Sequence, residues 1–438
     1  TEAAPVATPT ETPNTSLTEE YVINLRQQMA TDWKSPSEYA LHILFTKFIR
    51  HAENKLNVCI EYPLSTEPPI IEILGEGLDP AFDKIIESLG HIARNKPKPV
   101  IDAMMFWRKT KSEAANAAAE EVQKLMKEYE DESAYPRVIK SRSSSTSSSV
   151  LKRHRKDGSE GSNSFLPKRN ISSRAPTRTK TTYENHRLQD IQNNIEQQKI
   201  IALKLDRKSL ISIYILCRVL IEIIKQSPED ADEDLSDKLE EIVYAQLKIT
   251  DPVSLSSSII KSSNWNSFAE LLGCMSDKKF LSVSDRFISD LEKIPKRIKQ
   301  EEEPSVHLLI LGMRYLVLKN YPLDKFEESA DFMKSLAKFF LKTQNETVRL
   351  AYSEVTNQLL LPLAGSLSAE GNHPTWVDAM ETLLKAGKRL LLDSRSWANG
   401  FKLTVSILCA SPPQVCSEHW LPTIESSSSK IKTTKLDD

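Results

Sequence analysis

Hydrophobic residues recur every three or four positions along most of this 438-residue chain, which is the spacing of one face of an α-helix. Residues 35–62 show the pattern most clearly. Their predicted buried stripe comprises Leu41, Leu44, Phe45, Phe48, Ala52, Leu56 and Cys59. No strand-like alternation of apolar and polar residues persists over six positions, so the pattern predicts an all-α protein.

The stretch GEGLDPAFDK, residues 75–84, raises the question of a ligand site because it combines two glycines with three acids. It lacks the third glycine and the preceding strand of a dinucleotide site. Asp79 instead suits a helix N-cap, Pro80 the first helical position, and Asp83 the positive end of the helix dipole. We therefore predict a helix over 79–95 and no ligand. Its expected buried stripe contains Phe82, Ile85, Ile86, Leu89 and Ala93.

A further long helix is predicted to begin near Pro99, and regular helices follow residue 183. Their predicted ranges are 184–206, 208–226, 235–249, 253–262, 265–276, 281–293, 304–319, 324–342, 345–367, 374–393 and 396–410. Helices of about 10–22 residues, paired every 40 residues or so, favour a HEAT/armadillo-like α-solenoid of stacked helix pairs. A compact helical bundle is the alternative, which is disfavoured because so many helices would have to share one core.

A basic segment interrupts the helical pattern. Between Arg137 and Thr182 there are twelve lysines and arginines and two acids, a local charge of +10, which leaves −12 on the rest of the chain. The segment is rich in serine and threonine and lacks apolar periodicity, so we expect a disordered insert. The predicted organisation is a disordered lead-in (1–17), N-terminal helical repeats (18–136), the insert (137–182), a helical repeat array (183–422) and a frayed tail or fragment end (423–438).

The positive charge of the insert suggests nucleic-acid binding, but two observations disfavour it. Phe165 is the one aromatic residue between Arg137 and Thr182, so no stacking platform is present. The rest of the chain is acidic and would repel phosphate. An adaptor that binds nucleic acid or a membrane surface through the insert is kept as an alternative.

No catalytic, metal or cofactor site is predicted, because no Walker loop, His-Glu-x-x-His pair or Gly-x-Ser-x-Gly elbow occurs. The acids of 230–241 partly match the spacing of an EF-hand loop, but Leu235 stands where the sharp turn needs glycine. The five scattered cysteines indicate small thiols in a reducing compartment rather than a disulfide framework. An enzyme with unrecognised chemistry stays open, since residues distant in sequence can converge.

Basic residues precede hydroxyl side chains at a recurring spacing in the insert. Arginine lies three residues before four hydroxyls, and His154 lies five residues before a fifth. A basophilic kinase cleft lined with carboxylates selects such spacing, and the added phosphates would lower the local positive charge. We therefore predict phosphorylation at one or more of Ser145, Ser159, Ser172, Thr177 and Thr181.

The chain carries no predicted transmembrane segment or signal peptide. Its most apolar stretch, residues 210–224, is too short to span a bilayer and contains Arg218 and Glu222, so we expect a buried helix there. The start of the chain has neither the basic nor the apolar region of a signal peptide. We expect a fragment of a longer protein.

Several segments together resemble the N-terminal region of the Furry family, the cell morphogenesis proteins, and the style of the chain resembles its fungal members. The resemblance covers about residues 35–136 and 183–422. The segments that carry it are GLDPAFDKIIESLGHIARNKPKPVIDAMMFWRK (77–109), VLIEIIKQSP (219–228), LGMRYLVLKNYPLDKFEESADFMKSLAKFFL (311–341) and Trp420.

What the resemblance implies is a non-enzymatic HEAT/armadillo-like scaffold without a small-molecule substrate. Such proteins bind and promote activation of NDR/LATS-type kinases with their Mob co-activators, and in fungi support polarised growth and cell separation. The resemblance also implies a cytoplasmic location at the cell cortex. These kinases favour histidine five residues before the target and arginine three before it. His154 and Ser159 fit, but Lys156 replaces the arginine. The family supplies no partner-binding residue that transfers to this sequence.

Overall fold

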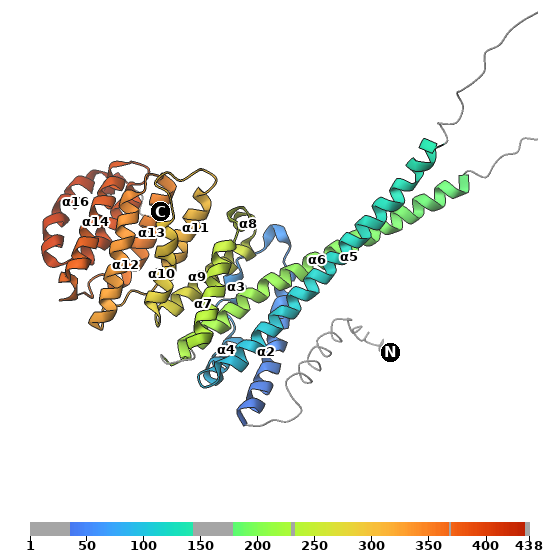
Figure 1. The fold of residues 1–438 in the computed structure, drawn as a ribbon, viewed down its shortest axis with the longest axis horizontal. Coiled ribbons are helices and arrows are strands. Elements are labelled where there is room, and N and C mark those ends of the chain that lie inside the picture. Colours follow the sequence, from blue (N-terminus) through green and yellow to red (C-terminus); the bar gives the residue numbers. More distant parts are fainter. Residues whose placement is uncertain (1–35, 143–177, 229–232, 368, 434–438) are drawn as a thin grey trace, which may run out of the picture. The chain divides into compact units, whose positions relative to one another are not determined.

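The computed structural model describes residues 36–142, 178–228, 233–367 and 369–433 (Figure 1). All regular elements within these ranges are helices, so the prediction of an all-α protein is confirmed there. They are α2 (Pro36–Glu61), η1 (Leu64–Thr66), α3 (Ile70–Leu74), α4 (Pro80–Ala93), α5 (Pro97–Arg142), α6 (Arg178–Gln226), α7 (Glu233–Ile249), α8 (Pro252–Ser256), α9 (Ile259–Ser276), α10 (Phe280–Glu292), α11 (Glu303–Leu311), η2 (Gly312–Tyr315), α12 (Leu323–Lys342), α13 (Glu346–Leu360), η3 (Leu361–Leu363), η4 (Glu370–Asn372), α14 (Pro374–Leu392), α15 (Trp397–Cys409) and α16 (Pro413–Thr433).

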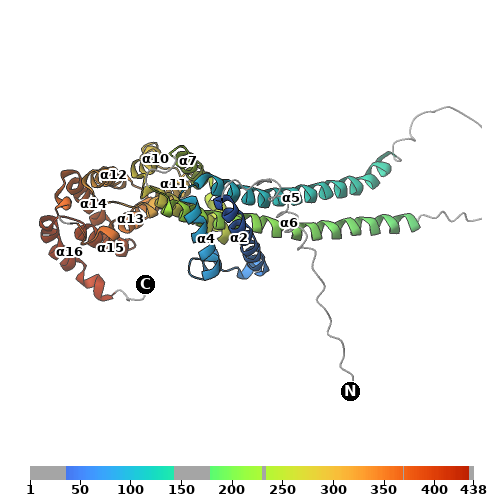
Figure 2. The same cartoon turned by 90° about the horizontal axis from the view of Figure 1, so that it is seen from below.

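The chain divides into two compact units. The larger unit is Thr1–Arg108 with Leu210–Asp438, and the smaller unit is Lys109–Ser209. In the smaller unit, α5 and α6 run alongside each other (Figures 1 and 2). An ion pair between Arg187 of α6 and Glu132 of α5 links the two helices.

Buried aromatic rings hold the start of the larger unit together. The stripe predicted for 35–62 is buried on α2 except for Leu44, which is half-buried. Phe48 of α2 contacts Phe82 of α4, with ring centroids 5.9 Å apart, and Trp107 of α5, at 5.4 Å. All three side chains are at most 1% exposed. Burying such rings is worth roughly 1.5–3 kcal/mol each, which fixes α4 against its neighbours.

Alternate helices pack on one another in the second half of the larger unit. Helix α12 contacts both α10 and α14, and α13 contacts both α11 and α15, as the two views show (Figures 1 and 2). Many side-chain hydrogen bonds here join residues 41 to 49 positions apart, such as Val317 to Ser276 and Ser406 to Asn357. The same offset recurs from Asp237 to Ser406. Each of the helices α12 to α15 therefore contacts the helix two positions before it in the chain.

Asp290 illustrates these long-range contacts, because it joins α10 to α7. Its carboxylate accepts from Tyr244 at 2.9 Å, Lys248 at 2.7 Å and Lys293 at 2.9 Å. Burial alone would raise the pKa of the Asp290 carboxyl, but these three hydrogen bonds outweigh burial and lower the pKa to about 2.

The lowered pKa predicts an acid-sensitive contribution to stability. Because the folded-state pKa lies below the ordinary value of 3.8, the stabilisation is complete above about pH 4 and disappears as the pH falls towards about 2. We expect Asp290→Asn to lower the free energy of unfolding by about 2–3 kcal/mol at pH 7. Urea unfolding at pH 7 and at pH 3 measures this, and a difference from wild type that does not shrink with acid would contradict it.

Several stretches differ from the sequence-based expectation. The predicted helices 253–262 and 265–276 are replaced by α8 and α9, and the predicted helix 304–319 is replaced by α11 and η2, which ends at Tyr315. The ranges 184–206 and 208–226 form one helix, α6, because no glycine or proline separates them. The backbone is helical at both edges of the predicted disordered insert, over 137–142 and 178–182, since helices extend more readily than they start. Helix α16 continues through the predicted frayed tail to Thr433. Its Thr423 and Ser427 are buried, and the Thr423 hydroxyl donates to the His419 carbonyl.

Candidate functional site

Two glycines, Gly75 and Gly77, form the turn that leads into α4. The Gly75 amide donates to the Ile71 carbonyl, and a Cβ on Gly75 would lie 2.2 Å from that oxygen. Gly77 has a φ of +85°, a left-handed conformation in which side chains are strained. The glycines therefore serve a sharp turn between α3 and α4.

The predicted start of α4 is confirmed. The Asp79 carboxylate accepts the amides of Ala81 and Phe82 at 3.1 Å each, and Pro80 is the first helical residue. Lys55 of α2 lies 2.7 Å from Asp79. The hydrogen bond from Lys55, followed by the one from the Phe82 amide, lowers the pKa of Asp79. All five predicted stripe residues of α4 are buried.

Asp83 accepts two hydrogen bonds in addition to its predicted interaction with the helix dipole. One oxygen accepts the Gly77 amide at 2.8 Å, and the other accepts from Arg218 of α6 at 2.7 Å. Arg218 also donates to the Leu74 carbonyl at 2.6 Å. One arginine thus ties the end of α3, the turn and the start of α4 to α6. Sequence reasoning missed this link because Asp83 and Arg218 are 135 residues apart.

The segments 77–109 and 219–228, which carry the family resemblance, meet along α4 and α6. Gln226 donates to the Glu87 carbonyl at 3.3 Å. A Cβ on Gly90 would lie within 3.0 Å of the Gln226 and Glu222 side chains. A larger residue at position 90 would therefore displace these two side chains.

A cleft of about 940 Å³ opens beside this contact. Its walls come from the α3–α4 turn, α4, α6 and α9, all in the larger unit. Ile71 and Leu78 are more than half exposed among the lining residues, whereas Ile86 and Ile221 are buried. The volume is in the range of sites that bind small molecules or peptide segments, so we take this α4–α6–α9 cleft as the candidate functional site.

Charged side chains line the cleft. Burial raises the pKa of Glu270, against the opposing effect of Lys225, and the negative charge of Glu76 raises it further. Burial also raises the pKa of Tyr214, which the charge of Arg218 partly offsets. The cleft lining thus combines carboxylates with basic residues, and charges of both signs act on Glu270.

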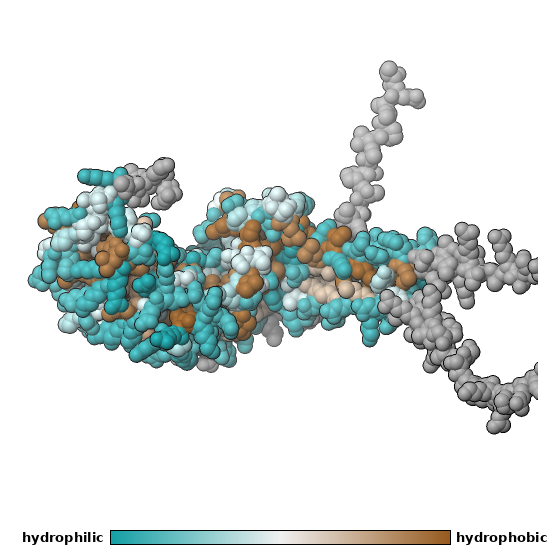
Figure 3. Space-filling view, turned by 90° about the horizontal axis from the view of Figure 1, so that it is seen from above, coloured by the Kyte–Doolittle hydropathy of each residue, from teal (hydrophilic) through white to brown (hydrophobic). Residues whose placement is uncertain are grey.

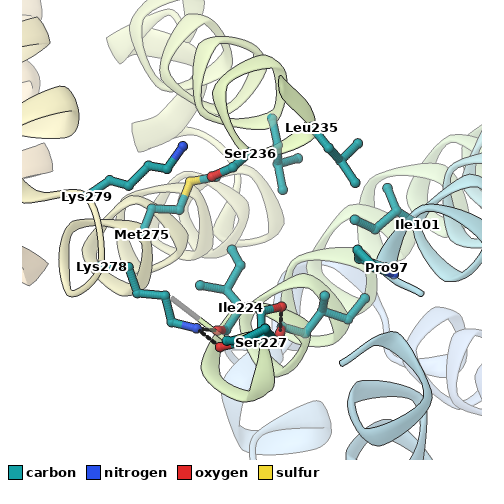
Figure 4. Close-up of a pocket in the computed structure, with 12 residues that line it drawn as sticks. Pro97, Ile101, Ile224, Ser227, Leu235, Ser236, Met275, Lys278 and Lys279 are labelled. Atoms are coloured by element: carbon teal, nitrogen blue, oxygen red, sulfur yellow. Dashed lines mark hydrogen bonds between the residues drawn. The ribbon is translucent and has the colours of Figure 1, made fainter. Parts of the chain in front are cut away.

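A second, smaller pocket of about 70 Å³ lies on the other side of the α6 terminus (Figure 4). Its apolar wall includes Ile101, Leu235 and Met275. Lys278 donates to the carbonyls of Ile224, at 2.5 Å, and Ser227, as the dashed lines in Figure 4 show. The ammonium therefore satisfies the last carbonyls of α6, which is a structural role.

The described residues offer no metal cluster, and two of their thiols are poorly nucleophilic. Within these ranges, no group of three His, Cys, Asp or Glu side chains is placed to hold a metal ion. Burial raises the pKa of the Cys217 and Cys274 thiols, which keeps them protonated and poorly nucleophilic. Two acids of the EF-hand-like pattern, at 230 and 232, lie outside the described ranges.

The predicted phosphorylation sites fall at the margin of the structure. Ser145, Ser159, Ser172 and Thr177 lie outside the described residues, and Thr181 lies on the backbone of α6. Phosphorylation at these sites stays a prediction.

The helices of the described ranges include no candidate membrane span. None of these helices combines the length and apolarity needed to cross a bilayer. On the face drawn in Figure 3, apolar side chains form separate patches among hydrophilic ones.

Comparison with known proteins identifies the family. Residues 206–437, more than half of the chain, match the family model described as "Cell morphogenesis N-terminal". The chain belongs to the cell morphogenesis, or Furry, family. This confirms the resemblance found in the sequence. Within the described residues, the matched range begins on α6 and includes the α6 and α9 walls of the cleft.

Two relatives of this Furry-family chain are fungal. It is 64% identical over 440 residues to the "Cell morphogenesis protein PAG1" of Saccharomyces cerevisiae, covering 97% of the chain and 18% of that protein. It is 30% identical over 415 residues to the "Cell polarity protein mor2" of Schizosaccharomyces pombe, covering 91% of the chain and 15% of that protein. The chain thus spans less than a fifth of either relative. No solved structure matches it.

Proposed function

We propose that this chain is part of a non-enzymatic scaffold that binds an NDR/LATS-type kinase with its Mob co-activator and promotes activation of the kinase. Through this role it supports polarised growth and cell morphogenesis from the cytoplasmic side of the cell cortex. The observation that carries the proposal is the family match over residues 206–437, together with relatives named for cell morphogenesis and cell polarity.

The helix packing supports the scaffold part of the proposal. The recurring offset of 41 to 49 residues and the contacts between alternate helices are those of stacked helix pairs. We infer a HEAT/armadillo-like solenoid on this basis, in which each pair contacts its neighbours. Solenoids present extended surfaces that bind segments of other proteins. The α4–α6–α9 cleft is the proposed contact site for a partner.

The proposal predicts that the chain and the kinase–Mob complex co-elute on size-exclusion chromatography, and that the chain raises kinase activity towards a peptide substrate. A variant lacking 143–177, the range outside the described helices, is expected to co-elute as well, because the proposed site lies on the folded part. The matched controls are kinase alone and Mob alone.

Two outcomes would contradict the proposal. If neither the chain nor the variant co-elutes, this part of the protein does not bind the complex. If only the deletion abolishes binding, the basic insert is the binding element, which favours the adaptor alternative.

A further inference from the structure

The α4–α6–α9 cleft contains more acid than its own bases neutralise. Arg218 is occupied by Asp83 and the Leu74 carbonyl. The remaining charged residues of the lining are four carboxylates and two amines, namely Glu76, Glu87, Glu222, Glu270, Lys84 and Lys225. In the described part of the chain, neither Glu76 nor Glu270 has a basic nitrogen within 4.0 Å. With four carboxylates and two amines besides the Asp83–Arg218 pair, the cleft lining has a net negative charge.

Tyr214 provides an independent indication of a ligand. Its side chain is 7% exposed and lines the cleft, yet its hydroxyl makes no hydrogen bond to any described residue. The hydroxyl oxygen itself is open to solvent in the cleft, so a ligand there can reach it. Glu270, like Tyr214, lines the cleft. A donor that enters the cleft would thus find the phenol oxygen and a carboxylate together.

The mouth of the cleft is apolar. Ile71 is 63% exposed and Leu78 is 54% exposed, and both line the opening. A ligand that combines a cationic group with an adjacent apolar group would use both features, since burying the apolar group removes the Ile71 and Leu78 side chains from water.

We propose that the cleft binds an extended basic segment of a partner protein, with one arginine side chain between Glu76, Glu270 and Tyr214 and a neighbouring apolar side chain on Ile71 and Leu78. The choice of a protein partner rests on the proposed scaffold function. A nucleic acid is disfavoured because the carboxylates repel phosphate. Arginine is favoured over lysine because its planar guanidinium has five donors, enough for two carboxylates and the phenol at once.

Fluorescence anisotropy with the 438-residue chain tests this directly. The probe is a fluorescein-labelled peptide, Gly-Ser-Leu-Ala-Arg-Leu-Gly-Ser, and its comparators replace arginine by lysine or glutamate. We expect the arginine peptide to bind about tenfold or more tightly than the glutamate peptide, with the lysine peptide between them. Binding should weaken as salt rises, because the carboxylates attract the cation through partly screened charge.

Variants of the cleft locate the site. The Glu76→Gln/Glu270→Gln double variant should weaken the arginine peptide about tenfold, and Tyr214→Phe about threefold. Glu354→Gln, which changes an exposed glutamate on α13 outside the cleft, is the matched control and should bind as wild type. Glu76→Gln alone, on the exposed turn, provides a second test with little risk to folding. Circular dichroism checks the fold of each.

Equal affinity for the arginine and glutamate peptides would overturn the proposal, as would undiminished binding to the double variant. These results are separate from the kinase test. Peptide binding without capture of the kinase–Mob complex would leave the cleft assignment intact and refute the proposed partner, and the reverse result would refute the cleft assignment alone.

Discussion

Trp376→Ala is expected to lower the local free energy of unfolding of α12–α15 by about 3–5 kcal/mol. Trp376 is fully buried at the start of α14. Its ring contacts Phe326 of α12, with centroids 5.2 Å apart, and its indole nitrogen donates to the Ala410 carbonyl at 2.8 Å. Truncation would leave a large cavity and a buried carbonyl without this donor.

Hydrogen exchange followed by mass spectrometry measures this effect locally, which suits a chain of two units better than a single global transition. Amides of α12, α14 and α15 should exchange about a hundredfold or more faster in Trp376→Ala. Trp420→Ala is the matched control, because Trp420 on α16 is 42% exposed and should cost about 0.5 kcal/mol or less. Equal effects of the two substitutions would contradict the packing of Trp376 against Phe326.

Arg218→Met is expected to release the turn that precedes α4. The substitution removes the charge partner of Asp83 and the donor to the Leu74 carbonyl. Because the two charged side chains are only 13% and 21% exposed, breaking the pair should cost about 2–4 kcal/mol. The Gly77 amide, bonded to the same carboxylate, should exchange faster in the variant.

A double-mutant cycle isolates this interaction from other effects of the substitution. Asp83→Asn combined with Arg218→Met should be less destabilised than the sum of the two single variants, with a coupling of about 1 kcal/mol or more. Arg297→Met, on an exposed loop, serves as the control. A coupling near zero would mean that the observed ion pair does not hold the turn.

Local rules predicted the beginnings of helices well. Asp79 and Pro80 begin α4 as expected, because an N-cap and a first-turn proline act within a few residues. The three-to-four-residue spacing located the buried faces of α2 and α4 for the same reason. The family was also identified correctly from three segments and Trp420, although none of them carries a catalytic signature.

Continuity of helices was harder to predict. Helix α16 was missed because its serine run and Pro422 are typical of a loop. In the structure, the hydroxyls of Thr423, Ser426 and Ser428 donate hydrogen bonds to carbonyls three or four residues earlier in the chain. These polar side chains are therefore satisfied within α16. Burial of Thr423 and Ser427 by other parts of the fold is not encoded in the local sequence.

The candidate site could not be predicted because its parts are far apart in the sequence. The cleft joins the turn after α3 to residues of α6 and α9, and its central ion pair spans 135 positions. Tyr214 is one of many apolar-face residues on α6 in the sequence pattern. Only the folded chain brings it together with Glu270 in the lining of one cleft.

The central claim is that this part of a Furry-family protein binds a kinase–Mob complex through its folded helices. Calorimetric titration of an NDR/LATS-type kinase, bound to its Mob co-activator, into the 438-residue chain tests it most directly. The account predicts saturable binding that is about tenfold weaker for Glu76→Gln/Glu270→Gln and unchanged for Glu354→Gln. Absence of binding by the unaltered chain at about 100 μM would contradict it.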